Sequence, residues 1–237
     1  MIDKQTKEKI MGKLAGLTGS VLYSLVTDDT VEEDDQEFGD IANLANANEY
    51  MYGRSKLVLI YNDIDSYVVK IPIKKHMIDE NTVEEYDCAY LKEPCENAND
   101  YCLLEEKVYQ KACEHQIEDM FAGTWHIGDI DGYPIYASEM VDYTFDDIDD
   151  ELEDEVGFVN RDCKETDEDL KSIGRQYRSS FIEYQALDLM LQKYGLERMD
   201  KLFVFMSEMT ITDLHSGNIG FNVDGTIKII DYPGFYN

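Results

Sequence analysis

Residues 213 to 234 read Asp213-Leu-His-Ser-Gly-Asn218-Ile-Gly-Phe-Asn-Val-Asp-Gly-Thr-Ile-Lys-Ile-Ile-Asp231-Tyr-Pro-Gly234. Two short apolar runs flank a polar turn in this stretch, which is the pattern of a β-hairpin. Asn218 precedes the first run and Asp231 ends the second, so a tight hairpin brings them side by side although they are thirteen positions apart. Carboxylate and amide oxygens are the ligands that Mg²⁺ prefers. The stretch therefore predicts a magnesium site, although an ordinary turn rich in Asp, Asn and Gly gives part of the same pattern.

Periodicity and turn signals extend the prediction to the rest of the chain. Strands are expected over 56–61, 67–73, 122–130 and 133–141, and helices over 4–25, 99–114, 166–194 and 199–209. Pro72 is expected near the end of its strand or at a sheet edge, because proline donates no ladder hydrogen bond. Asp131-Gly132 is a strong hairpin turn. Acidic segments are expected to form a linker over 27–37, an irregular insertion over 74–98, and an exposed loop or helix start over 142–155.

The composition is that of a folded and very acidic protein. Of 237 residues 43% are hydrophobic, and 51 acidic against 21 basic residues give a net charge of −30. Such a surface repels nucleic acid and anionic lipid and favours basic partners, so we expect no direct nucleic-acid or membrane binding. Two interpretations of the charge stay open, a protein that imitates nucleic acid and a solvated surface that keeps the chain soluble. The oligomeric state is not fixed by the sequence.

The number and spacing of the cysteines and histidines bear on whether disulfides or zinc hold the fold together. The five cysteines are odd in number and the four histidines are scattered. This argues against a disulfide framework and against a structural zinc site. No apolar run approaches the ~20 residues that span a bilayer, and the N-terminus lacks the apolar core of a signal peptide. We therefore expect a cytoplasmic protein.

The opening stretch resembles a known pair of motifs. Asp213-Leu-His-x-Gly-Asn218 followed by Ile-Ile-Asp231-Tyr-x-Gly is similar to the catalytic loop and metal motif of the protein-kinase-like superfamily. The closest branch is the aminoglycoside- and choline-kinase-like one. The residues of the two motifs are also similar to those of small kinase-like proteins encoded by bacteriophages. The resemblance implies ATP and Mg²⁺ as cofactors. It implies that Asp213 is the catalytic base, that His215 neighbours the γ-phosphate, and that Asn218 and Asp231 bind the metal.

The resemblance also implies an α+β, two-lobe fold. Residues 1–40 would form an N-terminal helix and acidic linker, 41–141 an N-lobe with a small antiparallel sheet and an acidic insertion, and 142–237 a mainly helical C-lobe. Because the sequence stops six residues after Asp231, we expect that C-lobe to be truncated after the metal motif.

Further site residues follow from the same resemblance. Lys70, in a Val/Ile-rich strand, would bind the phosphates, and Glu105 or Glu106 would pair with it. Glu105 is preferred because Leu104 and Val108 place it on the shoulder of the buried helix face. The remaining expected nucleotide contacts are Gly53 and Ser55 in the phosphate loop, which keeps one glycine only, and the backbone of Glu139 and Val141 at the adenine.

Two functions are compatible with these residues. The first is an ATP- and Mg²⁺-dependent phosphotransferase that acts on a protein or on a cationic small molecule. The second is a weak or inactive kinase-like protein whose acidic surface binds and inhibits a basic host partner, such as a nucleic-acid-binding protein. For a phage-encoded protein, the expected location is the host cytoplasm.

Overall fold

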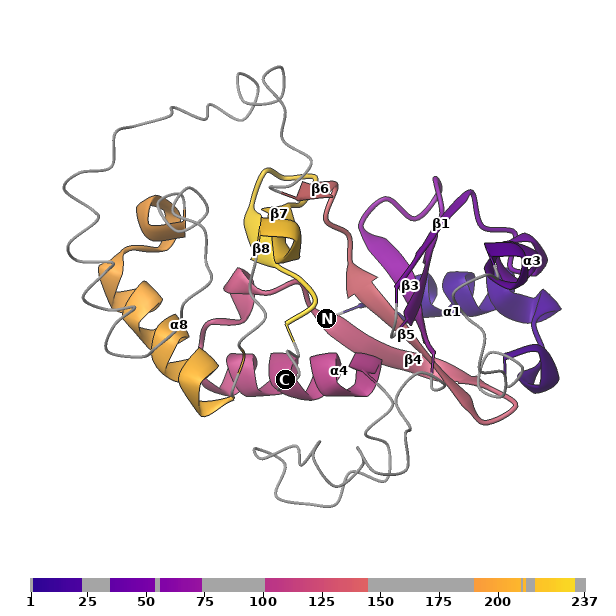
Figure 1. Ribbon diagram of the computed structural model, residues 1–237, viewed down its shortest axis with the longest axis horizontal. Coiled ribbons are helices and arrows are strands. Elements are labelled where there is room, and N and C mark those ends of the chain that lie inside the picture. Colours follow the sequence, from indigo (N-terminus) through magenta and orange to yellow (C-terminus); the bar gives the residue numbers. More distant parts are fainter. Residues whose placement is uncertain are drawn as a thin grey trace. The chain divides into compact units, whose positions relative to one another are not determined.

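The computed structural model of the protein describes residues 2–22, 35–53, 56–73, 101–144, 190–209, 211 and 216–232. The fold is α+β, as the sequence predicts, and it divides into two compact units (Figure 1). Unit 1 comprises Met1–Lys107 and Gly123–Met140, and unit 2 comprises Val108–Ala122 and Val141–Asn237. Among the described residues, no helix is both long and apolar enough to cross a membrane.

Unit 1 is built on a five-stranded antiparallel sheet. The strands are β1 (Glu49–Tyr52), β2 (Lys56–Ile60), β3 (Tyr67–Pro72), β4 (Thr124–Ile130) and β5 (Tyr133–Glu139), in the order β1-β2-β3-β5-β4. All four strands that the sequence predicts here are present, and Pro72 is the last residue of β3. Asp131 and Gly132 both have positive φ, 50° and 82°. Such values suit the tight turn that joins β4 to β5.

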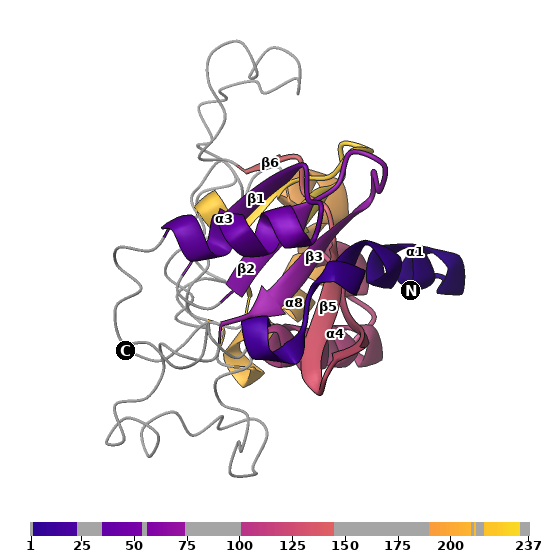
Figure 2. The same ribbon diagram turned by 90° about the vertical axis from the view of Figure 1, so that its right-hand side faces the viewer.

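One face of this sheet carries the hydrophobic core of unit 1. Alternate strand residues enter the core, namely Leu57, Leu59, Val69, Ile71, Tyr133, Ile135 and Ala137. Helices α1 (Lys4–Lys13) and α3 (Asp35–Leu44) cover this face and add Ile10, Phe38, Ile41 and Ala42 (Figure 2). Because side chains alternate along a strand, the residues between those positions face the other way. That second face meets the beginning of helix α4 (Tyr101–Glu114) through Glu105.

The N-terminal region departs from the sequence prediction. The helix expected over 4–25 ends at Lys13, a 3₁₀ turn, η1, occupies Leu14–Gly16, and helical residues resume over 19–22. A Cβ on Gly16 would lie 2.5 Å from the carbonyl oxygen of Leu44. Position 16, where η1 ends, therefore requires glycine, because a side chain there would collide with the end of α3.

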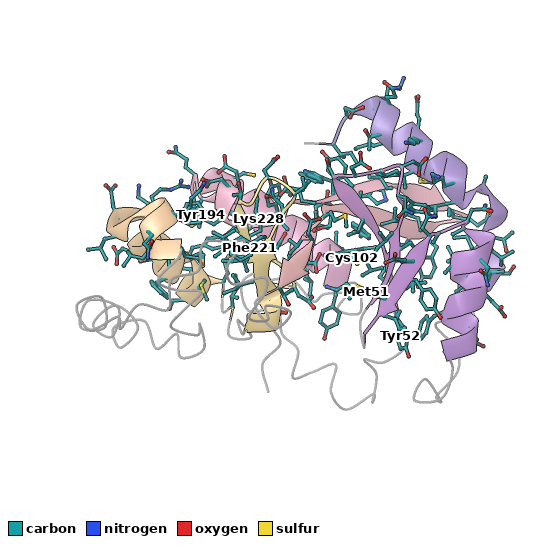
Figure 3. The ribbon with its side chains drawn as sticks, turned by 90° about the horizontal axis from the view of Figure 1, so that it is seen from above. Met51, Tyr52, Cys102, Tyr194, Phe221 and Lys228 are labelled. Carbon is teal, nitrogen blue, oxygen red and sulfur yellow. The ribbon has the colours of Figure 1, made fainter. Side chains whose placement is uncertain are left out.

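Two elements of unit 1 were not predicted. Asp35–Glu37, expected in the acidic linker, form the first residues of α3. Strand β1 is exposed at all four positions and therefore lacks the alternation that identifies a half-buried strand. Its residues Met51 and Tyr52 are labelled in Figure 3, and Tyr52 stacks on Phe38 of α3 with 4.5 Å between ring centroids.

Unit 2 contains the C-terminal hairpin that the sequence predicts. Strands β7 (Ile219–Phe221) and β8 (Ile227–Ile229) pair in antiparallel register, and β6 (Tyr143–Thr144) adds to β7. The segment around β6 was expected to be a loop or helix start, so this short strand corrects the prediction for those two residues. Helix α8 (Leu196–Glu208) matches the helix expected near 199–209.

Other predictions for unit 2 are tested only in part. Residues 190–194 are helical and Gly195, with φ of 77°, stops that helix as expected. The rest of the helix predicted over 166–194 lies outside the described residues, as do the insertion over 74–98 and most of the acidic segments over 27–37 and 142–155.

Candidate functional site

A buried ion pair joins Lys70 of β3 to Glu105 of α4. The Lys70 ammonium Nζ lies 2.6 Å from Glu105 Oε2, and the two residues are 7% and 0% exposed. Lys70 occupies a polar position between Val69 and Ile71, so strand alternation directs it away from the hydrophobic core and toward α4. The pair that the sequence predicts between these residues is thus present in the structure.

The neighbouring Glu106 has a different role. Its Oε1 accepts a hydrogen bond of 3.0 Å from the backbone N–H of His126 in β4. Successive helix residues point about 100° apart, because the helix has 3.6 residues per turn, so Glu105 and Glu106 cannot both reach Lys70 in the same way. The structure therefore pairs Lys70 with Glu105, and Glu106 binds the edge strand β4.

A second lysine shares the Glu105 carboxylate, and sequence analysis missed it. Lys56, the first residue of β2, contacts Glu105 Oε1 and is only 7% exposed. In the β2–β3 register, Val58 lies opposite Lys70 and Lys56 lies opposite Pro72. Positions 56, 58 and 70 therefore share one face of the sheet. The strands predicted over 56–61 and 67–73 are separated by five residues only, and the hairpin pairing that this short connection implies was the signal that could have found Lys56.

Hydroxyl groups complete the surroundings of Glu105. Thr124 Oγ1 donates a 3.0 Å hydrogen bond to Glu105 Oε2, and it lies 3.0 Å from Ser138 Oγ. Thr124 and Ser138 are buried. A buried carboxylate is tolerated when it is paired and its oxygens accept hydrogen bonds, and here both oxygens do so. We call Lys56, Lys70, Glu105, Thr124 and Ser138 the lysine–glutamate cluster.

In unit 2 the hairpin brings the backbones of Asn218 and residue 230 together. The N–H of Ile230 donates a 2.8 Å hydrogen bond to the carbonyl oxygen of Asn218, so Asp231 follows immediately after the last paired residue. Asn218 ends a 3₁₀ turn, η5 (Ser216–Asn218), and is 6% exposed. The predicted proximity of the Asn218 and Asp231 backbones therefore follows from the register of β7 and β8.

Asp231 has an uncommon backbone conformation, with φ of 52°. Non-glycine residues adopt this region rarely, although aspartate and asparagine tolerate it best. Residues on both sides of Asp231 are fixed, since Ile230 pairs with Asn218 and the Tyr232 hydroxyl donates a 2.9 Å hydrogen bond to Ala122 O. Tyr232 also packs edge-on against Phe121, with 5.0 Å between ring centroids. Strained backbone that the surroundings enforce in this way is typical of functional positions.

The donor set of the hairpin fits magnesium better than zinc. Asn218 and Asp231 offer one amide oxygen and one carboxylate, and Mg²⁺ is usually held by one or two such groups together with phosphate and water. Within the described part of the chain, no three histidine, cysteine or acidic side chains gather as a metal site.

Three of the remaining predicted site residues, Gly53, Glu139 and Val141, lie among the described residues. Gly53 lies in the turn between β1 and β2 and donates its N–H to Lys56 O at 3.1 Å, and a Cβ there would meet nothing within 4 Å. Glu139 ends β5, where its N–H donates to Gly123 O at 2.9 Å, and Val141 is the first residue of unit 2 after the boundary. The predicted residues Ser55, Asp213 and His215 lie outside the described residues.

Comparison with known proteins gives no relative, since no family model, no curated protein and no solved structure matches the chain.

Proposed function

We propose that the chain is an ATP- and Mg²⁺-dependent phosphotransferase of the kinase-like type, with unit 1 in the role of the N-lobe and unit 2 in that of the C-lobe. The observation that carries the proposal is the buried ion pair between Lys70 on the third strand of the sheet and Glu105 on the following helix. Kinases use a lysine at this place to bind ATP phosphates and a helix glutamate to hold it. Neither residue is needed to fill the hydrophobic core on the opposite face of the sheet.

In this proposal each described residue has one task. Lys70 binds phosphate oxygens as a point charge, and Glu105 fixes the direction of its side chain. Asn218 and Asp231 would hold Mg²⁺, which neutralises charge on the transferred phosphoryl group when it is bound. The uncommon backbone conformation of Asp231 supports this assignment, because the hairpin and Tyr232 hold the residues on both sides of it.

The residues that act on the phosphoryl acceptor are assigned from the sequence motif. Asp213 would accept the proton of the acceptor hydroxyl, and His215 would lie near the γ-phosphate. A protein segment or a small molecule with positive charge is the acceptor class that we propose, because the net charge of −30 attracts cations.

A nucleotide titration with and without Mg²⁺ tests the proposal. The full chain is expected to bind ATP more tightly with Mg²⁺, and Asp231→Asn is expected to lose this Mg²⁺ dependence while keeping its thermal stability. Asparagine tolerates the positive φ, so the variant removes charge without changing the backbone. Val223→Ala, at an exposed turn position of the same hairpin, is the control and should bind as the wild type does. Equal ATP affinity with and without Mg²⁺ would argue against the metal site.

Transfer itself requires a separate measurement. Incubation with labelled ATP and a basic protein such as a histone is expected to give label in protein, and Asp213→Asn is expected to abolish it. Label that persists in the Asp213→Asn variant would contradict the assignment of Asp213 as the catalytic base.

The very acidic composition favours a second candidate, a kinase-like protein that binds a basic host partner without catalysis. Attraction between exposed charges is screened by salt over about 8–10 Å at physiological ionic strength. This candidate predicts capture of a basic protein that persists in Asp213→Ala and disappears in high salt. Capture that depends on Asp213 would contradict it.

A further inference from the structure

We propose that Lys56 is a second phosphate-binding cation, which acts beside Lys70 on the same polyphosphate. This inference rests on the proposed function for the class of ligand, and it adds a residue to that site. The motivating observation is that two lysines from neighbouring strands, both buried, contact the two different oxygens of one glutamate.

The register of the sheet makes the two lysines neighbours. Lys70 lies opposite Val58, and Lys56 is two positions before Val58 on the same face of β2. Diagonal neighbours of this kind have Cα atoms about 7–8 Å apart, within reach of long side chains. The Glu105 carboxylate lies between the two ammonium groups and contacts both. The two cations therefore point into one small region above the sheet rather than away from each other.

The charges explain why such an arrangement suits a polyphosphate. One carboxylate needs one cation, and a second ammonium group beside the first adds repulsion between like charges. A ligand with several negative oxygens relieves that repulsion because each lysine can take a different oxygen. An ammonium group has three N–H donors, so contact with Glu105 and contact with a phosphate oxygen are compatible. A tripolyphosphate chain offers enough oxygens for both lysines.

A purely structural Lys56 would behave differently. If Lys56 only braced Glu105, its removal would lower stability and leave the affinity for small anions carried by Lys70 largely intact. If Lys56 binds phosphate, affinity for inorganic tripolyphosphate depends on its charge, and arginine restores much of that affinity. The two roles are therefore separated by an anion titration.

The test is calorimetric titration of the full chain with inorganic tripolyphosphate and, separately, with Mg²⁺ and ATP. Lys56→Met is expected to weaken both affinities about tenfold, as expected for one charge-assisted hydrogen bond. Lys56→Arg is expected to recover most of the loss. Lys13→Met is the matched control, because it also removes a lysine that pairs with a carboxylate of unit 1, namely Asp63 at 2.8 Å, whose side chain is 50% exposed. It should leave both affinities unchanged.

The outcomes separate this inference from the proposed function. Wild-type affinities in Lys56→Met overturn the role of Lys56 and leave the phosphotransferase proposal standing. Binding of tripolyphosphate but not of ATP, weakened by Lys56→Met, overturns the ATP function and keeps the paired lysines. Absence of binding to either ligand by the wild type overturns both.

A second measurement uses the wild-type chain, in case the Lys56 variants fail to fold. Tripolyphosphate is expected to shift the NMR signals of the side-chain CH₂ groups of Lys56 and Lys70 and to leave those of Lys13 in place. Shifts at Lys70 without shifts at Lys56 would overturn the inference.

Discussion

The single carboxylate of Glu105 balances the charge of two buried lysines in unit 1. It contacts Lys56 and Lys70 and accepts a hydrogen bond from Thr124, and it is fully buried. Removing one partner of a buried pair leaves the other charge without compensation. For Glu105 the remaining charges are two ammonium groups on one face of the sheet, whereas removal of either lysine leaves Glu105 with the other.

This asymmetry gives a prediction for stability. Glu105→Gln is expected to lower the free energy of unfolding by about 3–5 kcal/mol, the range for a broken buried ion pair. Lys70→Met is expected to have a smaller effect because Lys56 still neutralises Glu105. Urea unfolding of the two variants measures the difference. A loss in Lys70→Met that equals or exceeds the loss in Glu105→Gln contradicts the shared carboxylate.

Single residues of the cluster were predictable to different degrees. Lys70 and a glutamate partner at position 105 or 106 were expected from the resemblance to kinase-like proteins, and helix periodicity favoured Glu105 because it lies beside buried leucine and valine. Lys56 was missed because a lysine at the start of a strand looks like an ordinary edge charge. Only the pairing of β2 with β3 shows that it faces the same way as Lys70.

At the scale of elements, the β7–β8 hairpin determines where Asn218 and Asp231 lie. Its turn is closed by Asn222, whose side-chain Oδ1 accepts hydrogen bonds from the N–H groups of Thr226 at 2.9 Å and Asp224 at 3.2 Å. Gly225 has φ of 67° and donates its N–H to Asn222 O at 2.8 Å. The turn therefore fixes the register on which the proposed metal site depends.

Asn222→Ala tests the importance of this turn. The change removes two hydrogen bonds at a partly buried turn and is expected to destabilise the protein by about 1–2 kcal/mol. It should also weaken Mg²⁺-dependent ATP binding, because the register positions Asn218 and Asp231. Thermal unfolding and a nucleotide titration measure the two effects, and Val223→Ala, 63% exposed in the same turn, should change neither. An Asn222→Ala variant with wild-type stability would show that the strands alone set the register.

A pH-dependent contact joins α8 to the 3₁₀ turn η3 (Glu118–Met120). Arg198 Nη1 donates a 2.7 Å hydrogen bond to Asp119 Oδ2, and its Nη2 contacts Asp119 Oδ1. These hydrogen bonds lower the pKa of Asp119 below its ordinary value of 3.8, although burial opposes the shift. A carboxyl whose pKa is lowered by folding stabilises the fold above its unfolded-state pKa, and this contribution is lost as the pH falls through the folded-state pKa.

Asp119→Asn is therefore expected to destabilise the protein at neutral pH and to lose its effect in acid. The difference in unfolding free energy from the wild type should be at most about 1 kcal/mol, since the pair is partly exposed. It should shrink as the pH falls below 3.8. Urea unfolding at several pH values measures it, with Glu197→Gln, from the exposed pair with Lys201, as the control. A difference that grows in acid would contradict the sign of the pKa shift.

The elements themselves were predictable wherever their pattern was regular. Strands β2 to β5, α4, α8 and the β7–β8 hairpin follow from alternation, helical spacing and turn residues. Strand β1 lacks alternation because all its side chains are exposed. The close approach of the Leu44 carbonyl to Gly16, beside the break after α1, joins positions twenty-eight residues apart, and no local pattern reports such a distant contact.

At the scale of the whole molecule, the net charge of −30 is the dominant electrostatic property. Self-repulsion of like charges destabilises a compact state, and salt screens it, with a Debye length that falls from about 30 Å at 0.01 M to about 3 Å at 1 M. The urea midpoint is therefore expected to rise when NaCl is increased from about 0.02 M to about 0.5 M.

A charge-reversal variant controls for non-electrostatic effects of the salt. Asp40→Lys, at an exposed position of α3, should stabilise the protein more at low salt than at high salt. A midpoint that falls with salt, in the wild type and in this variant, would show that attractive ion pairs outweigh the repulsion.

The course of the chain through the two units limits how gene recombination could separate them. The chain crosses between the units after Lys107, after Ala122 and after Met140, and the first crossing lies inside α4. No single continuous gene fragment therefore encodes one unit alone. A recombination event that moved either unit to another gene would have to cut one helix in two. We expect the lysine–glutamate cluster and the Asn218–Asp231 hairpin to be transmitted together, as one genetic block.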